Sequence, residues 1–203
     1  MVWHVFNRSI AEYQIFNTPA DYKRFITAMD FYRYNNKNKI SLSNLLYFDK
    51  DLIFNKNERF IKINSYCIMP NHYHVIVDDN DSNLLSKYIS NLENSYTRYF
   101  NIKHKRKGPL WESRYKKIPV TKNEYFIHLT RYIHLNPVTA YICSKPEEYE
   151  YSSYKEFLSN QEDICDFKYL MPEDFESKIY KDFVEDRISY QRELNKIKNL
   201  IFD

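Results

Sequence analysis

The stretch Tyr66–Val77, YCIMPNHYHVIV, decides the fold because it joins two runs of strand-forming residues through a Pro-Asn turn. Apolar and β-branched residues on both sides of that turn favour an extended chain. The pattern predicts two antiparallel strands, over residues 59–69 and 72–79. His72 and His74 lie at the start of the second strand.

Two further elements are predicted on the N-terminal side of this hairpin. Residues 2–10 are rich in β-branched and aromatic residues and predict a first strand. Thr18, Pro19 and Asp21 indicate a helix start, because Thr is a common cap, Pro suits the first helical position and an acidic residue follows three places after the cap. The segment 42–63 contains a run that suits a strand, a short helix or both.

On the C-terminal side, the spacing of apolar residues changes to that of a helix. Over residues 82–100 they recur every three or four positions and predict an amphipathic helix. Residues 114–120 suit another strand. The capping-box sequence TKNE at 121–124 predicts a helix that ends near Leu135, because Asn136 precedes a proline.

The order of these elements is typical of an α+β sandwich, with a central antiparallel sheet and helices on one face. Beyond about residue 145 the chain becomes acidic and polar, and residues 172–203 are expected to form one or two peripheral helices. We therefore expect a domain over residues 1–158, followed by an acidic, mainly helical C-terminal extension over residues 159–203.

The composition indicates a globular protein, since 43% of the 203 residues are apolar and 28% are charged. The three cysteines are widely spaced and form no CxxC pair, which argues against a disulfide framework and against a structural zinc site. No signal-peptide pattern and no membrane-length apolar run is present, so we expect a cytoplasmic protein without membrane association.

Charge is unevenly distributed along the chain. The net charge of +3 does not by itself indicate nucleic-acid binding. However, residues 103–117 carry seven Lys and Arg against one acidic residue, whereas residues 146–187 carry thirteen Asp and Glu against five basic residues. A basic stretch of this kind suits DNA phosphates, although a solvated loop and helix end would explain it equally well. The candidate DNA-binding residues are Arg98, Lys103, Lys105, Arg106, Lys107, Arg114, Lys116 and Lys117.

His72 and His74 are candidate metal ligands. Side chains alternate between the two faces of a strand, so both imidazoles are expected to point to the same face and could bind one divalent cation. Histidine pairs at this spacing that bind nothing are also common, so the spacing alone leaves both interpretations open.

A second group of candidates lies in HLTRYIHLNPV, residues 128–138. On a helix, Tyr132 and Asn136 are one turn apart and share a face. A tyrosine hydroxyl can act as a nucleophile in phosphoryl transfer, and an amide oxygen can bind Mg²⁺ or Mn²⁺. Because the chain has twenty tyrosines, this pattern alone does not single out Tyr132. His134 points away from both residues and is expected to be structural, while His128 suits either DNA contact or packing.

Taken together, these stretches resemble the single-tyrosine HUH transposases, and most closely the REP-associated tyrosine transposases. The stretches are MPNHYHVIV, HVFNRSIAEYQIF near the start, YTRYFNIKHKRKGPLWESRYKK in the middle and RYIHLNPVTAYI after it. The similarity covers roughly residues 2–158 in order. Several linked motifs at the right separations are far more specific than any one alone.

The resemblance implies a ferredoxin-like or RRM-like fold, with the histidines on a central strand and the tyrosine on a helix over the sheet. It implies that His72, His74 and Asn136 bind Mg²⁺ or Mn²⁺ and that Tyr132 is the nucleophile. The implied partner is single-stranded or hairpin DNA, which the enzyme, as a monomer or homodimer, nicks and rejoins through a 5′-phosphotyrosine. Tyr73, between the histidines, is expected to face away from the metal and to pack.

Two alternatives share part of this pattern. An HUH nickase of the replication-initiator or relaxase kind would use the same metal and tyrosine chemistry, although the YIHLNPV context argues against it. A non-catalytic α+β domain that binds nucleic acid would use Tyr132 and the histidines only structurally. Formation of a metal-dependent covalent adduct separates this last alternative from both enzymes.

Overall fold

Four antiparallel strands form a single sheet in the computed structural model, which describes residues 1–34, 42, 58–79 and 82–202. The strands are β1 (Val2–Arg8), β2 (Ile61–Met69), β3 (His72–Asp79) and β4 (Lys116–Pro119). Their order in the sheet is β2-β3-β1-β4, and the predicted hairpin is present as the antiparallel pair of β2 and β3. β1 pairs with β3 on one side and with β4 on the other.

Among the described residues, two α-helices connect the strands, and four more follow β4. They are α1 (Pro19–Phe31), α3 (Ser82–Lys103), α4 (Asn123–Thr139), α5 (Tyr154–Ser159), α6 (Ser177–Glu185) and α7 (Ile188–Phe202). The alternation of strands and helices through β4, with this strand order, confirms the expected ferredoxin-like or RRM-like sandwich. Most of the ambiguous segment 42–63 lies outside the described residues, which resume at residue 58.

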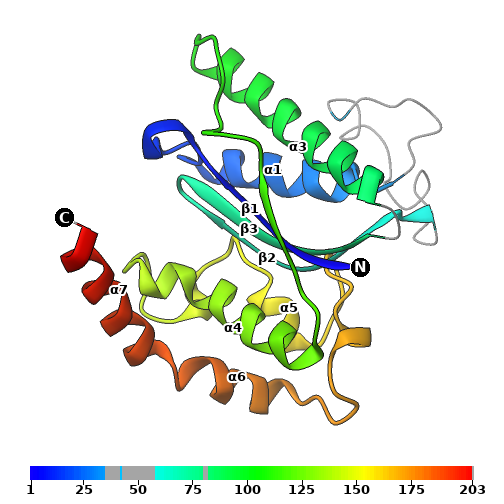
Figure 1. The fold of residues 1–203 in the computed structure, drawn as a ribbon, viewed down its shortest axis with the longest axis vertical. Coiled ribbons are helices and arrows are strands. Elements are labelled where there is room, and N and C mark those ends of the chain that lie inside the picture. Colours follow the sequence, from blue (N-terminus) through cyan, green and yellow to red (C-terminus); the bar gives the residue numbers. More distant parts are fainter. Residues whose placement is uncertain (35–41, 43–57, 80–81, 203) are drawn as a thin grey trace.

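The sheet is covered on both faces (Figure 1). α1 and α3 lie on one face, whereas α4 and the helices that follow it lie on the other. The expectation of helices on one face is therefore corrected for the C-terminal part of the chain. The reason is visible in β2, which is buried at every position except Lys62 and so needs a neighbour on each face. β4, in contrast, is exposed along its whole length, and this edge of the sheet is accessible.

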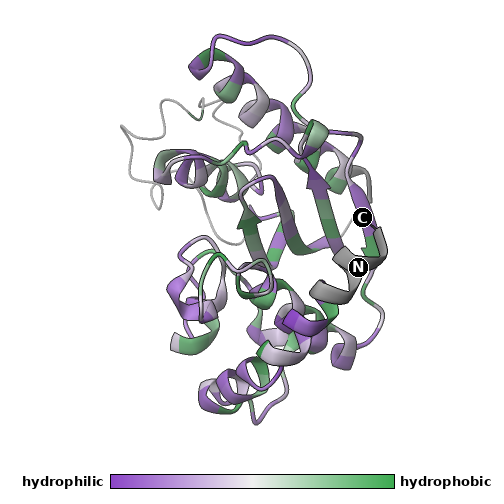
Figure 2. Cartoon of the chain, turned by 90° about the vertical axis from the view of Figure 1, so that its left-hand side faces the viewer, coloured by the Kyte–Doolittle hydropathy of each residue, from purple (hydrophilic) through white to green (hydrophobic). Residues whose placement is uncertain are grey.

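An aromatic cluster fills the space between the sheet and the helices α1 and α3. Tyr73 is fully buried there, with its ring centroid 5.2 Å from that of Phe25 and 5.5 Å from that of Trp111. Its hydroxyl donates a hydrogen bond to Glu93 Oε1 on α3 at 2.7 Å. The expectation that Tyr73 packs away from the histidine face is confirmed. Figure 2 shows the hydrophobic stretches along the strands that supply this core.

The helix α1 begins as the sequence predicts, but α4 differs from its prediction at both ends. The capping box TKNE does not form, because α4 starts after Lys122 without a side-chain cap. The helix also continues through Pro137, which lacks the N–H that the Ile133 carbonyl would accept. The Asn136 side-chain amide donates to that carbonyl at 3.5 Å and to the Tyr132 carbonyl at 3.2 Å. This side chain thus supplies a donor to the carbonyl that Pro137 leaves without its usual backbone partner.

The chain beyond α5 returns to the sheet and then packs on α4. The Asp166 backbone N–H donates to the Ile63 carbonyl of β2, and its carboxylate pairs with Arg33 and Arg59. The helices expected over residues 172–203 are present as α6 and α7, both in contact with α4. The division of the chain at residue 158 stays a prediction. No helix in the described ranges is long and apolar enough to span a bilayer.

Candidate active site

The two histidines of β3 share one face of the sheet, as their spacing predicts. The ring centroids of His72 and His74 are 5.2 Å apart, and their planes are perpendicular. This face is the one covered by α4, opposite to the aromatic cluster around Tyr73. The alternation of β3 therefore places the candidate ligands His72 and His74 on one face of the sheet and Tyr73, which packs in the core, on the other.

Each of the two imidazoles uses its Nδ1 atom in a hydrogen bond. His72 Nδ1 lies 2.6 Å from Asn71 Oδ1, and His74 Nδ1 lies 2.9 Å from His4 Nε2 on β1. An amide oxygen can only accept, so His72 carries its proton on Nδ1 and keeps a lone pair on Nε2. His4 was not among the residues that the sequence singled out. Finding it requires the register of β1 on β3, which no local pattern contains.

Both histidines are neutral near pH 7 because burial disfavours their charged forms. Burial, together with a smaller contribution from the nearby Arg8 guanidinium, lowers the pKa of His72 to about 4. The pKa of His74 is held well below its ordinary value by burial, with further contributions from His72, His4 and Arg8. Neutral imidazole is the form that binds a metal ion.

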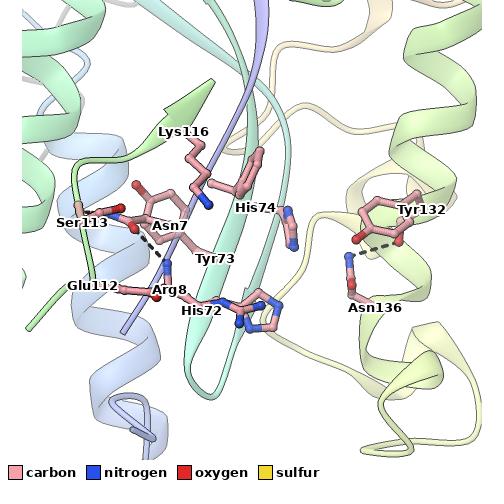
Figure 3. Close-up of a pocket in the computed structure, with 11 residues that line it drawn as sticks. Asn7, Arg8, His72, Tyr73, His74, Glu112, Ser113, Lys116, Tyr132 and Asn136 are labelled. Atoms are coloured by element: carbon pink, nitrogen blue, oxygen red, sulfur yellow. Dashed lines mark hydrogen bonds between the residues drawn. The ribbon is translucent and has the colours of Figure 1, made fainter. Parts of the chain in front are cut away.

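Tyr132 and Asn136 face the histidines from α4, as Figure 3 shows. The Tyr132 ring lies edge-on to His74, with 5.7 Å between centroids and 82° between planes. Its side chain is 40% exposed, and partial burial raises its pKa. Asn136 uses its Nδ2 atom in the hydrogen bonds to its own helix, so these hydrogen bonds do not involve its Oδ1 atom.

All four candidate residues line one cavity of about 430 Å³. Its other lining residues are Phe6, Asn7, Arg8, Tyr73, Glu112, Ser113 and Lys116. Two neutral imidazoles and an amide oxygen suit a divalent cation. The described part of the chain contains no group of three or more His, Cys, Asp or Glu residues placed to bind a metal.

Two cationic side chains also line this cavity. Arg8 lies opposite His72 in the register of β1 and β3, and Lys116 lies opposite Phe6 in the register of β1 and β4. Arg8 pairs with Glu12 at 2.7 Å, an exposed contact that contributes little to stability. Sequence reasoning missed Arg8 because it stands alone, far from the basic stretch.

Of the eight predicted DNA-binding residues, only Lys116 lines the cavity. Its neighbour Lys117 lies on the opposite face, 4.1 Å from the centroid of the Trp3 ring. Lys103 forms a 2.6 Å ion pair with the buried Asp21. The others lie along α3 and on the loop that follows it, namely Arg98, Lys105, Arg106, Lys107 and Arg114. A DNA-binding role for these residues stays a prediction.

The two remaining histidines of α4 lie outside the cavity. His134 is fully buried, with Nδ1 2.8 Å from the Tyr180 hydroxyl of α6 and Nε2 2.8 Å from Ser153 Oγ. Its predicted structural role is confirmed. His128 is exposed, lies 2.9 Å from Arg131 and is near Phe183 of α6, and a DNA contact of this residue stays a prediction.

Comparison with known proteins identifies the family of this chain and agrees with its fold. A family model described as "Transposase IS200 like" matches residues 32–136, about half of the chain. This chain belongs to the IS200-like transposase family. The matched range contains His72, His74, Tyr132 and Asn136. A search of curated proteins finds no match.

Solved structures place this transposase among similar folds. A REP-associated tyrosine transposase bound to a REP hairpin aligns with a TM-score of 0.52 and 16% identity, covering 82% of this chain and 88% of the other. A candidate transposase from Deinococcus radiodurans R1 aligns with a TM-score of 0.38 and 11% identity, covering 66% and 88%. The first of these supports the fold of the IS200-like chain described here.

Proposed function

We propose that this transposase cuts and rejoins single-stranded DNA through a 5′-phosphotyrosine linkage on Tyr132. The observation that carries the proposal is the single cavity in which Tyr132 faces two neutral histidines from another element of the fold. Such an arrangement combines a nucleophile with a cation site, as metal-assisted phosphoryl transfer requires.

The residues present are suited to Mg²⁺ or Mn²⁺. The ligands would be Nε2 of His72, Nε2 of His74 and Oδ1 of Asn136, since the hydrogen bonds of these side chains use their other atoms. A bound cation would polarise the scissile phosphate and offset the negative charge that develops on its oxygens.

The chemical step belongs to Tyr132. Its Oη attacks the phosphorus atom and forms a P–O bond, while the bond from phosphorus to the 3′ oxygen of the preceding nucleotide breaks. The phenol proton leaves to solvent, and the departing 3′ oxygen takes up a proton. Arg8 and Lys116 are placed on the cavity wall to bind the phosphate oxygens.

A tyrosine is suited to this step because the cut end must be joined again. The phosphotyrosine linkage is itself a phosphodiester and conserves the energy of the bond that was broken, so a DNA 3′-OH can attack the phosphorus atom and release free Tyr132. Water as the nucleophile would give a hydrolysed end instead. We further propose hairpin or inverted-repeat DNA as the substrate, because the structurally similar REP-associated transposase is bound to a REP hairpin.

A labelled-oligonucleotide experiment tests this function. The wild type, Tyr132→Phe and Tyr125→Phe are incubated with Mn²⁺ and single-stranded oligonucleotides that span inverted repeats flanking the gene. Tyr125 is a matched control, because it is similarly exposed and lies two turns earlier on α4. DNA labelled at its 3′ end should become covalently attached to the wild type and to Tyr125→Phe, but not to Tyr132→Phe.

The outcomes separate the proposal from its alternatives. Attachment of the 5′ label would show the opposite polarity, and an undiminished adduct with Tyr132→Phe would exclude this nucleophile. Tight DNA binding without any adduct would indicate a non-catalytic domain. Rejoining of the adduct to a second 3′-OH end would distinguish strand transfer from simple nicking.

A further inference from the structure

His4 lies behind the proposed metal ligands without lining their cavity. Its Nε2 atom is 2.9 Å from His74 Nδ1, and the planes of the two rings differ by 25°. His4 is 6% exposed and His74 is 8% exposed, so the hydrogen bond between them is shielded from water. Since His4 is absent from the cavity wall, it reaches the site through its neighbours, by a hydrogen bond with His74 and a ring contact with Phe6 at 5.0 Å.

A histidine that binds a metal through Nε2 must keep its proton on Nδ1, and a fixed acceptor at Nδ1 ensures this. Asn71 Oδ1 supplies such an acceptor to His72 at 2.6 Å. His4 Nε2 occupies the equivalent place at His74. Both candidate ligands thus have a hydrogen-bond partner at Nδ1, an amide oxygen at His72 and an imidazole nitrogen at His74.

We propose that His4 is a positioning residue that accepts the Nδ1–H of His74 and so keeps the Nε2 lone pair of His74 directed into the cavity. The proposal rests on the proposed function for its link to the metal, but not for the hydrogen bond itself. A carboxylate at this place would bring a negative charge behind a cavity that must receive a phosphate. A neutral imidazole fixes the tautomer and the ring orientation without adding that charge.

The tautomer can be measured without metal, DNA or catalysis. In metal-free protein with ¹⁵N-labelled histidine at pH 7.5 (about one unit above the ordinary histidine pKa), long-range ¹H–¹⁵N spectra distinguish the Nδ1–H from the Nε2–H form. The wild type should show His74 as Nδ1–H. His4→Gln, which retains an acceptor oxygen, should preserve this form, whereas His4→Phe should allow the Nε2–H form that free imidazole favours. His74 in the Nε2–H form in the wild type would overturn the proposal, whether or not any variant folds.

Manganese affinity supplies a second readout. In isothermal titrations with Mn²⁺, His4→Phe should bind the ion about 10- to 100-fold more weakly than the wild type. This is the loss typical when a residue that supports a metal ligand is removed. His4→Gln should retain most of the affinity. His104→Phe is the control, since it removes an exposed histidine at the end of α3 that plays no part in the site. Unchanged affinity in a folded His4→Phe, or equal losses in His4→Phe and His4→Gln, would overturn the positioning role.

The two readouts also separate this inference from the proposed function. If the wild type shows the Nδ1–H form of His74 but binds no Mn²⁺, the metal-dependent function fails while the role of His4 in fixing the tautomer stands. If Mn²⁺ binds and His74 carries its proton on Nε2 in the free protein, the role of His4 fails alone.

Discussion

The two sides of the cavity are held in different ways. On β3, His72 and His74 lie in a sheet, and each is fixed by a hydrogen bond to its Nδ1 atom. On α4, Tyr132 is 40% exposed, and His134 makes buried polar contacts on the opposite side of the helix. The proposed cation side is therefore held in place by the sheet, whereas the proposed nucleophile depends on how α4 is supported on its opposite side. Changes on the two sides should accordingly have different consequences.

The largest effect is expected from His74→Ala, which removes a ligand from the fixed side. Metal catalysis contributes several kcal/mol to phosphoryl transfer, so adduct formation should fall roughly a thousandfold. The free energy of unfolding should change by no more than about 2 kcal/mol, because the sheet around the residue is retained. Adduct yields with Mn²⁺ and urea unfolding curves measure the two quantities. A loss of activity that merely follows a loss of folded protein would contradict the interpretation of His74 as a ligand.

The reverse pattern is expected from His134→Leu, which removes the anchor behind α4. The substitution removes the hydrogen bonds of His134 to Tyr180 and Ser153 and its 3.2 Å contact with Ser65 of β2. Tyr180 and Ser153 keep other partners, so the cost is that of the lost hydrogen bonds, about 0.5–1.5 kcal/mol each, and the variant should lose roughly 2 kcal/mol of stability. Its adduct formation, measured where it remains folded, should stay within about tenfold of the wild type. A stable but inactive variant would place His134 in the chemistry.

The pH dependence of stability gives a separable effect at the same residue. Burial lowers the pKa of His134 to about 3, below the value of about 6.5 expected in the unfolded chain. The unfolded state therefore takes up the proton first as pH falls, and the stabilisation present above pH 6.5 is progressively lost on the way toward pH 3. At pH 5 the loss should be roughly 2 kcal/mol. His134→Gln should lack this share of the pH dependence when the free energy of unfolding is measured by urea titration at pH 7, 6 and 5. If the free energy of unfolding changed with pH by the same amount in the variant and the wild type, this would argue against a neutral buried His134.

Much of this comparison was predictable from local sequence. Strand alternation places His72 and His74 together and turns Tyr73 away, and helical spacing pairs Tyr132 with Asn136. Contacts between distant segments were not predictable in this way. His4 meets His74 only through the register of β1 on β3. The continuation of α4 past Pro137, against the usual effect of proline, involves a hydrogen bond from the Asn136 side-chain amide to the Ile133 carbonyl.

The basic stretch shows the same limit of prediction from local sequence, because adjacent charged side chains lie on opposite faces of the sheet. The sequence grouped the lysines of β4 as equivalent candidates, and strand alternation implies only that neighbours point in opposite directions. Which of them faces the cavity depends on how β4 pairs with β1, since Lys116 lies opposite Phe6 and Lys117 lies opposite Val5.

The smallest predicted effect uses these two lysines as a matched pair. Lys116→Gln and Lys117→Gln remove the same charge from neighbouring residues, but only Lys116 lines the cavity. If Lys116 neutralises one DNA phosphate, its loss should reduce the slope of log K against log salt by roughly 0.7 for single-stranded DNA. Lys117→Gln should leave the slope nearly unchanged. Fluorescence anisotropy at several salt concentrations, with Tyr132→Phe as the background to prevent cleavage, measures both. Equal reductions would mean that the overall charge of the protein, and not the face on which a lysine lies, governs binding at this edge of the sheet.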